Sequence, residues 1–220
     1  TLKSLQDGYA LKALMKNEKN KKVAIIGAGF IGLEAVEAAK KYGKEVSVFQ
    51  LGDRILQDVF DKEITDLLEE ELRKHDVNLY VQETVTELIG DGKVEKVVTN
   101  NREVEADVVI IATGVRPNTE FLKDSGIEML RNGAIVVDNH GRTSIEDVYA
   151  AGDCATIYQI VQDEQSYVPL ATGANKLGRI VGENLAGMDT EFQGSLASSC
   201  IKVMDMEAGR TGITEEKAKA

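Results

Sequence analysis

The sequence has no tryptophan, only two cysteines, two histidines and two prolines, and 5% aromatic residues. Cys154 and Cys200 form no Cys-x-x-Cys pair, so neither a zinc site nor a local redox pair is predicted, and both thiols are expected to be buried. His75 and His140 are expected at the surface. These few residues form no recognisable catalytic triad or metal site, so we predict no catalytic residue and no metal ligand in this chain.

Long apolar runs are also missing. No run approaches the roughly 18 residues that cross a bilayer, and the N-terminus lacks the apolar core of a signal peptide. The formal net charge of −11 disfavours nucleic acid and anionic membranes, because both attract basic surfaces. The sequence therefore predicts a cytoplasmic protein with no nucleic-acid and no membrane partner. Its 220 residues, 43% of them hydrophobic, are enough to form a folded core.

Residues 23–32 read VAIIGAGFIG, an apolar strand-like run followed by a Gly-x-Gly-x-x-Gly turn that opens a helix. In such a turn Gly27 permits the tight bend, Gly29 lets the backbone approach a pyrophosphate, and Gly32 lets helix and strand pack closely. The positive end of the helix then meets the phosphate charge. A second strand over 45–50 completes a βαβ unit. The predicted cofactor-binding turn consists of Gly27, Ala28, Gly29, Phe30, Ile31 and Gly32.

The order of predicted elements indicates an α/β fold, in which a Rossmann-like parallel sheet has an antiparallel β-meander as one crossover. Residues 1–20 are expected to form a helix and linker. A helix over 61–75 is expected to bury Ile64, Leu67, Leu68 and Leu72. A strand over 77–81, a meander over 84–105 and a strand over 106–112, buried on both faces, complete this part.

From residue 115 the pattern changes to that of a chain crossing into a second α/β domain. Short strands are expected over 134–138 and 148–150, the latter placing Asp153 at the carboxyl edge of a sheet. A helix over 170–187 is expected to bury Leu177, Ile180, Val181 and Leu185. A strand over 198–205 and a helical turn from 214 end the chain. The expected domains are 1–20, 21–114, 115–189 and 190–220.

Four stretches carry a family resemblance. They are GAGFIGLE at 27–34, ATGVRPN at 112–118, VYAAGDCA at 148–155 and PLATGANKLGRIVGENLAG at 169–187. In order and separation they resemble the pyridine nucleotide-disulfide oxidoreductase family. Residues 191–214 look most like the start of the interface domain of CoA-disulfide reductases and NADH oxidases. The resemblance implies a homodimeric FAD enzyme reduced by NAD(P)H, whose FAD fingerprint and redox cysteine lie before the present Thr1. This chain is then expected to be a fragment, with the NAD(P)H-binding domain over 21–114, the C-terminal part of an FAD-type domain over 115–189 and the start of the dimer-interface domain over 190–220.

The resemblance also implies roles for single residues. Phe30 resembles the aromatic gate over the nicotinamide, with ordinary core packing as the alternative. Glu34 resembles the glutamate that holds the nicotinamide amide, with a plain helix-surface carboxylate as the alternative. Gly114 is expected beside the nucleotide, and Asp153 is expected to accept a hydrogen bond from the ribityl chain. Backbone groups near the flavin ring are expected from Leu170, Ala171 and Thr172.

Gln50 stands where NAD-specific proteins usually have Asp or Glu for the ribose 2′-hydroxyl. Glutamine can bond that hydroxyl, but it lacks the charge that repels a 2′-phosphate. Nearby, Asp53 opposes a phosphate and Arg54 favours one. We therefore favour NADH and keep NADPH open.

Three functional interpretations follow. The first is the NAD(P)H-binding portion of a CoA-disulfide reductase or NADH oxidase, which places nicotinamide for hydride transfer to flavin. The second is the same portion of an NADH peroxidase. The third, from another class, is an isolated dinucleotide-binding module without turnover of its own. The sequence leaves the electron acceptor open among a disulfide, oxygen and peroxide.

Overall fold

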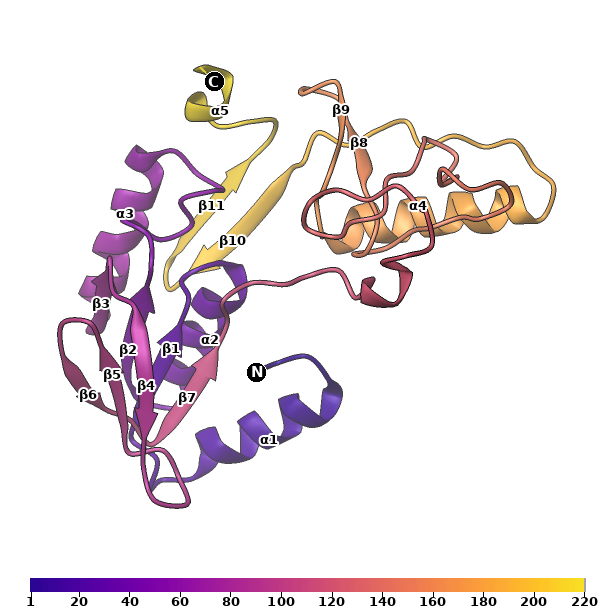
Figure 1. The fold of residues 1–220 in the computed structure, drawn as a ribbon. Helices are drawn as coiled ribbons and strands as arrows, with labels where there is room; N and C mark the ends of the chain where they lie inside the picture. The colour runs from indigo at the N-terminus through magenta and orange to yellow at the C-terminus, as the bar shows by residue number, and fades with distance from the viewer. Residues whose placement is uncertain (220) are drawn as a thin grey trace. The chain divides into compact units, whose positions relative to one another are not determined.

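A computed structural model describes residues 1–219, which form two compact units (Figure 1). The first unit comprises residues 1–114, 200–210 and the C-terminal residues from Thr214. The second comprises residues 115–199 and 211–213. Each unit has a hydrophobic cluster of its own. The mixed α/β class predicted from the sequence is confirmed.

A four-stranded parallel sheet forms the centre of the first unit. Its strands are β1 (Lys22–Ile26), β2 (Glu45–Gln50), β3 (Val77–Val81) and β7 (Val108–Ile111), in the order β3-β2-β1-β7. Ile25 pairs with Val48 on one side and with Ile110 on the other. After β1, the next two strands, β2 and β3, add to one side of β1, and β7 then pairs with its other side. A crevice at the carboxyl ends of β1 and β7 is where such sheets bind ligands.

Alternating side chains of the strands supply two different cores, because successive residues of a strand point to opposite faces. Val23 and Ile25 join the large cluster that contains residues of α2 (Phe30–Lys41) and α3 (Lys62–Lys74). Ala24, between them, joins a second cluster with Phe49 and with Val97 of the meander. Helices therefore cover one face of the sheet, and the meander covers the other.

The meander was predicted and is confirmed. It consists of β4 (Val85–Ile89), β5 (Lys96–Thr99) and β6 (Glu103–Glu105), paired antiparallel in that order. Two neighbouring strands of the parallel sheet contribute a stacked aromatic pair, and an arginine of the meander segment lies over one of its rings. The rings of Phe49 and Tyr80 stack with centroids 5.2 Å apart, and the Arg102 guanidinium lies 4.5 Å from the Tyr80 centroid. Such pairs add to the stabilisation from buried area alone.

The prediction of which α3 side chains are buried is partly wrong. Leu68 and Leu72 are fully buried, whereas Ile64 and Leu67 are 41% and 49% exposed. Two glutamates take the inner positions instead. Glu69 Oε1 accepts a hydrogen bond from the Ile55 backbone amide. Glu71 Oε1 accepts one from the backbone amide of Asp205. Carboxylates can be buried here because the backbone supplies their partners.

Strand β7 differs from the prediction that it is buried on both faces. Val108 and Ile110 are buried, but Ile111 is 41% exposed. The reason is topological, since β7 is an edge strand of the parallel sheet and only β1 pairs with it. Edge strands expose part of their side-chain surface.

Three further elements belong to the first unit. Helix α1 (Leu5–Lys16) is capped by Ser4, whose hydroxyl accepts from the Asp7 amide while the Asp7 side chain accepts from Ser4. The hairpin of β10 (Ser199–Val203) and β11 (Met206–Arg210) adds Ile201, Val203 and Ala208 to the large cluster. The sequence predicted only its first strand. Cys200, expected to be buried, is exposed. The expected helical start near the C-terminus is α5 (Glu215–Lys219).

The second unit contains less regular structure than predicted. Its elements are a 3₁₀ turn η1 (Glu120–Leu122), the hairpin of β8 (Ile157–Gln159) and β9 (Glu164–Ser166), and helix α4 (Ala171–Leu185). The strands expected over 134–138 and 148–150 reduce to isolated bridges at Ile135 and Tyr149. Asp138 turns the chain here, because its carboxylate accepts the backbone amides of both His140 and Arg142. Asp153 therefore does not end a sheet strand.

Helix α4 has the predicted extent, but its buried face is narrower. Leu177 and Ile180 are buried, Val181 is half-buried, and Leu185 is 64% exposed. Asn184 is the buried residue at the end of the helix. Its side-chain amide donates to the carbonyls of His140 and Thr190, which joins α4 to two loops. A polar side chain thus fills the position where a leucine was expected.

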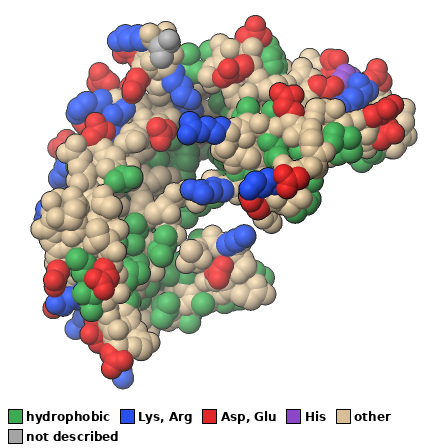
Figure 2. All heavy atoms as spheres, in the orientation of Figure 1, with side chains coloured by type: hydrophobic (Ala, Val, Ile, Leu, Met, Phe, Trp, Pro, Cys, Tyr) green, Lys and Arg blue, Asp and Glu red, His purple; other side chains and the backbone are tan. Residues whose placement is uncertain are grey.

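Among residues 1–219, none of the helices has the length and apolar composition that a transmembrane segment requires. In the view of Figure 2, acidic and basic side chains are interspersed over the visible face.

Candidate nucleotide site

The glycine-rich turn follows β1 directly, at the carboxyl edge of the parallel sheet. Gly27 has a φ of +101°, and its amide donates to the Phe49 carbonyl at 2.8 Å. A Cβ at Gly27 would overlap the carbonyl oxygen of Ala112, which follows β7. Both the positive φ and the close strand therefore require glycine. Gly27 lies where β1 and β7 end side by side.

The other two glycines of the turn differ in what surrounds them. A Cβ at Gly32, in the first turn of α2, would overlap the Gly27 carbonyl oxygen, so Gly32 allows helix and turn to touch. Around Gly29 the space is open, and an added Cβ would meet no atom within 4 Å. Gly29 is the N-cap of α2, and no side chain caps this end. The first amides of the helix thus face an open space suited to an anion.

Gln50 contacts this turn through its side chain. Its Oε1 accepts a hydrogen bond from the Ala28 amide at 3.0 Å, and the Ala28 carbonyl accepts from the Leu56 amide at 3.1 Å. Ala28 is fully buried. The end of β2 and the loop after it are therefore tied to the backbone of the turn. Sequence spacing predicted that Gln50 lies near the turn, but not this bond.

Phe30, Ile31 and Glu34 occupy the first turn and a half of α2. Phe30 is half-buried against the large hydrophobic cluster, which fits its packing role. Ile31 and Glu34 are exposed. Glu34 lines a shallow hollow of about 360 Å³ with Glu37, Lys41 and others. The glycine turn does not line this hollow.

Gly114 lies two residues after Ala112, at the end of the strand that touches Gly27. It is exposed, with a φ of +105° and no atom within 4 Å of an added Cβ. The structure thus brings the glycine turn, Gln50 and the segment after β7 to one edge of the sheet. This is the arrangement that the sequence predicted for the first part of the site.

The loop after β2 holds an arginine whose partners were not predicted. Arg54 Nη1 lies 3.2 Å from Asp53 Oδ1, and its Nη2 lies 3.3 Å from Glu216 Oε2. Glu216 belongs to α5, far along the chain, so no local pattern indicated this pair. The guanidinium is therefore already neutralised by two carboxylates, which weakens its attraction for a 2′-phosphate. Leu51, beside it, is 72% exposed.

The predicted flavin-contacting residues all belong to the second unit. Asp153 is exposed and follows Gly152, whose φ is +97°. Leu170 is the N-cap of α4, and Ala171 and Thr172 are exposed in its first turn, again without a side-chain cap. Burial, together with the nearby charge of Asp153, raises the pKa of the Tyr167 hydroxyl. Tyr167 is an unpredicted neighbour of this group, because no motif marks it.

Two comparisons with known proteins bear on these residues. The family model of the pyridine nucleotide-disulphide oxidoreductases matches residues 1–178. A NAD(P)H coenzyme A polysulfide/persulfide reductase of Pyrococcus horikoshii is 44% identical over 96% of this chain and 47% of its own length. An NADH oxidase of Streptococcus pyogenes is 40% identical over 99% of this chain and 48% of its own.

Solved structures agree. The water-forming NADH oxidase of Lactobacillus brevis, bound to NADH, superimposes with a TM-score of 0.92 at 34% identity, over 99% of this chain and 48% of the oxidase. The chain therefore spans about half the length of the relatives that it matches. On the family model and on these relatives, the chain belongs to the pyridine nucleotide-disulphide oxidoreductase family.

Proposed function

We propose that this chain is the NAD(P)H-binding portion of an FAD-dependent oxidoreductase, and that its first unit holds the dinucleotide. The observation that carries the proposal is the open, uncapped N-terminus of α2 beside Gly29, framed by two glycines that admit no side chain. Unpaired helix amides and the helix dipole both favour a pyrophosphate at this point. In the proposed enzyme, the bound nicotinamide supplies a hydride to FAD.

The contribution of this chain is positioning, which lowers the barrier to a transfer between two bound cofactors. Gly27, Gly29 and Gly32 shape the turn that receives the phosphates. Glu34, exposed in the second turn of α2, is proposed to hold the nicotinamide amide. In the second unit, Asp153 and the uncapped start of α4 are proposed to contact the flavin.

NADH is the favoured donor. Gln50 Oε1 already accepts the Ala28 amide, and its second lone pair is free for a ribose hydroxyl. Arg54, the nearest guanidinium along the chain, is paired with Asp53 and Glu216. The names of the relatives include both NADH and NAD(P)H enzymes, among them a coenzyme A polysulfide/persulfide reductase and a water-forming NADH oxidase. A homodimeric, cytoplasmic parent enzyme is part of this proposal.

A second candidate is a dinucleotide-binding module without turnover. The glycine turn, Gln50 and Gly114 all belong to the first unit, and this favours a self-contained nucleotide module. The two candidates differ in flavin chemistry, since a module binds the nucleotide only.

Titration of the chain with NADH, followed by nicotinamide fluorescence, tests the nucleotide site. Saturable binding is expected, and its absence would overturn the proposal. A visible spectrum with added FAD, before and after anaerobic NADH, separates the candidates. A flavin band that NADH bleaches shows that the chain holds both cofactors in working geometry. NADH binding without retained flavin identifies the chain as the donor module.

A further inference from the structure

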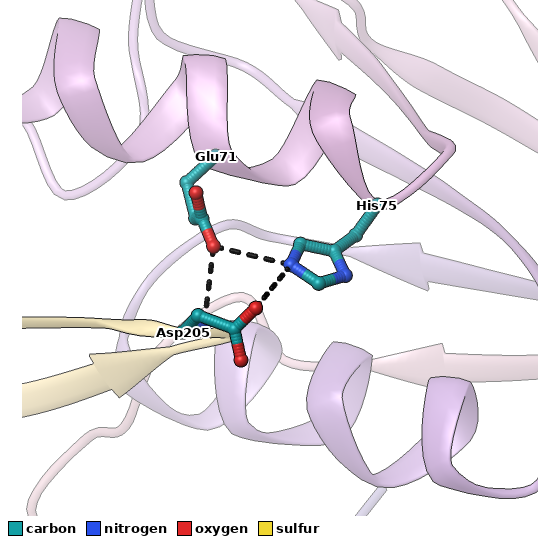
Figure 3. A group of neighbouring side chains, drawn as sticks. All are labelled: Glu71, His75 and Asp205. Carbon is teal, nitrogen blue, oxygen red and sulfur yellow. Dashed lines mark hydrogen bonds and ion pairs between the residues drawn. The ribbon is translucent and has the colours of Figure 1, made fainter.

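A histidine and two carboxylates converge in the first unit, away from the nucleotide site (Figure 3). Glu71 lies in the last turn of α3, His75 is the C-cap of that helix, and Asp205 lies in the turn between β10 and β11. His75 Nε2 is 3.1 Å from Glu71 Oε1 and 3.1 Å from Asp205 Oδ2. One ligand atom from each residue lies within 4.8 Å of the other two.

Both oxygens that approach Nε2 belong to carboxylates, which only accept hydrogen bonds when ionised. A bare nitrogen lone pair at that position would face two negative groups. A proton on Nε2 points in one direction and cannot lie in line with both oxygens. A cation placed between the three atoms attracts all of them. A shared, bent hydrogen bond from Nε2 can join the two oxygens, and the same three atoms are also close enough together to bind one metal ion.

The donor set and its spacing fit zinc. Zinc binds both imidazole nitrogen and carboxylate oxygen, and water can take a fourth position. Metal–ligand distances of about 2.0–2.2 Å put neighbouring ligand atoms on a tetrahedral ion about 3.3 Å apart. The two observed separations of 3.1 Å are close to this value.

The site is built rather than a chance meeting of surface groups. The Glu71 side chain is only 7% exposed, and its Oε1 also accepts the Asp205 backbone amide at 3.1 Å. This bond fixes the hairpin turn against α3. Two lysines lie near the cluster: Lys74 Nζ is 3.8 Å from Glu71 Oε2, and Lys202 Nζ donates to the carbonyl of Met204, which precedes Asp205.

We propose that Glu71, His75 and Asp205 form a structural zinc site that fastens the β10–β11 hairpin to α3. The ion joins residues that are distant in the sequence, as structural zinc ions do in other proteins. The site is independent of the nucleotide, so NADH binding and zinc binding are separate properties of the chain.

Calorimetric titration of the untagged chain with ZnCl₂ at neutral pH tests the proposal. We expect one ion per chain and a rise in Tm when zinc is present. His75→Gln and Asp205→Asn are each expected to weaken binding about tenfold or more and to abolish the rise in Tm. Asp205 is 82% exposed on its side chain, so Asp205→Asn is expected to fold normally.

His140→Gln is the matched control. His140 also lies between two carboxylates, but Asp189 approaches its Nδ1 and Glu191 its Nε2, so their oxygens do not converge on one atom. Zinc affinity is expected to be unchanged in this variant. No saturable binding, or equal binding in wild type and His75→Gln, would overturn the proposal. Binding that survives in both ligand variants would place the ion at another group, such as Cys200, and would also overturn it.

Discussion

The side-chain oxygen of Gln50 accepts a hydrogen bond from the amide of Ala28, so the end of β2 and the glycine turn form one connected edge. The bond orients the side chain that is proposed to face the adenosine ribose. It also occupies one lone pair of Gln50 Oε1 and leaves the second lone pair able to accept another hydrogen bond. The chemistry at position 50 therefore decides which groups on the ribose are accepted.

Replacing Gln50 by glutamate is expected to sharpen the preference for NADH. A carboxylate can keep the bond to Ala28 and can also accept from the 2′-hydroxyl, but it repels a 2′-phosphate. The ratio of NADPH to NADH dissociation constants is expected to rise about tenfold, which corresponds to about 1.4 kcal/mol. Fluorescence titration measures both constants. Gln6→Glu on the surface of α1 adds the same charge elsewhere, and an equal change in this control would contradict the explanation.

Replacement by alanine is expected to have different effects at Gly32 and at Gly29, on stability at the first and on NADH binding at the second. Gly32→Ala places a Cβ against the Gly27 carbonyl oxygen and is expected to lower the free energy of unfolding by about 1–3 kcal/mol. Gly29→Ala meets no protein atom and is expected to leave stability nearly unchanged while it weakens NADH binding, because the methyl enters the proposed phosphate space. Urea unfolding and NADH titration separate the two effects. Normal NADH affinity in Gly29→Ala would remove that residue from the site.

Helix α3 offers a matched pair of leucines. Leu68 is fully buried and Leu67 is 49% exposed. Leu68→Ala is expected to cost about 2–5 kcal/mol, because it leaves a cavity in the large cluster, whereas Leu67→Ala is expected to change stability by less than about 0.5 kcal/mol. Urea denaturation of both variants measures the difference. Equal losses would mean that Leu67 also packs in the folded protein.

Glu83 makes part of the stability depend on pH. Burial raises the pKa of this carboxyl, but hydrogen bonds from Thr99 and Asn101 and the charge of Arg102 outweigh burial and leave the pKa below its usual 4.5. Thr99 Oγ1 donates to Glu83 at 2.6 Å and Arg102 Nε at 2.8 Å. A lowered folded-state pKa stabilises the protein above pH 4.5, and this stabilisation is lost as pH falls through the folded-state pKa.

Glu83→Gln is therefore expected to be less stable than wild type at neutral pH, with a difference that shrinks as pH falls below 4.5. Urea unfolding at several pH values gives this comparison. Glu87→Gln, at an exposed position on β4, is the control and is expected to show no such trend. A gap between Glu83→Gln and wild type that stays constant with pH would contradict the assignment.

Local patterns predicted much of the fold. Strands 45–50 and 77–81 have the predicted bounds, because each is an apolar run between turn residues. The meander followed from its Asp-Gly and Asn-Asn turns. The failures depend on neighbours that are distant in the sequence. Glu69 replaces Ile64 and Leu67 on the inner face of α3 only because the Ile55 amide is there to bond it. Likewise Ile111 is exposed because β7 has a single partner strand.

In the candidate site too, features that depend on local sequence were predicted, and features that depend on distant segments were not. The conformation of the glycine turn is local, so the sequence predicted which glycines admit no side chain. The partners of Arg54 and the position of Tyr167 were not predicted, because they depend on segments brought together by folding. The same holds for His75, which was expected to be a plain surface residue. Asp205 reaches Glu71 across 134 residues of chain, a separation that no sequence pattern reports.

The passage of the chain out of the first unit and back sets the order in which the protein can be completed during synthesis. The last buried residue of the second unit's hydrophobic cluster is Phe192. The cluster of the first unit also includes Ile201, Val203 and Ala208, which come later in the sequence. Closing this long loop costs little extra free energy, but it slows folding. During synthesis, most of the first unit therefore emerges before the second unit, but the hydrophobic cluster of the first unit is completed after that of the second.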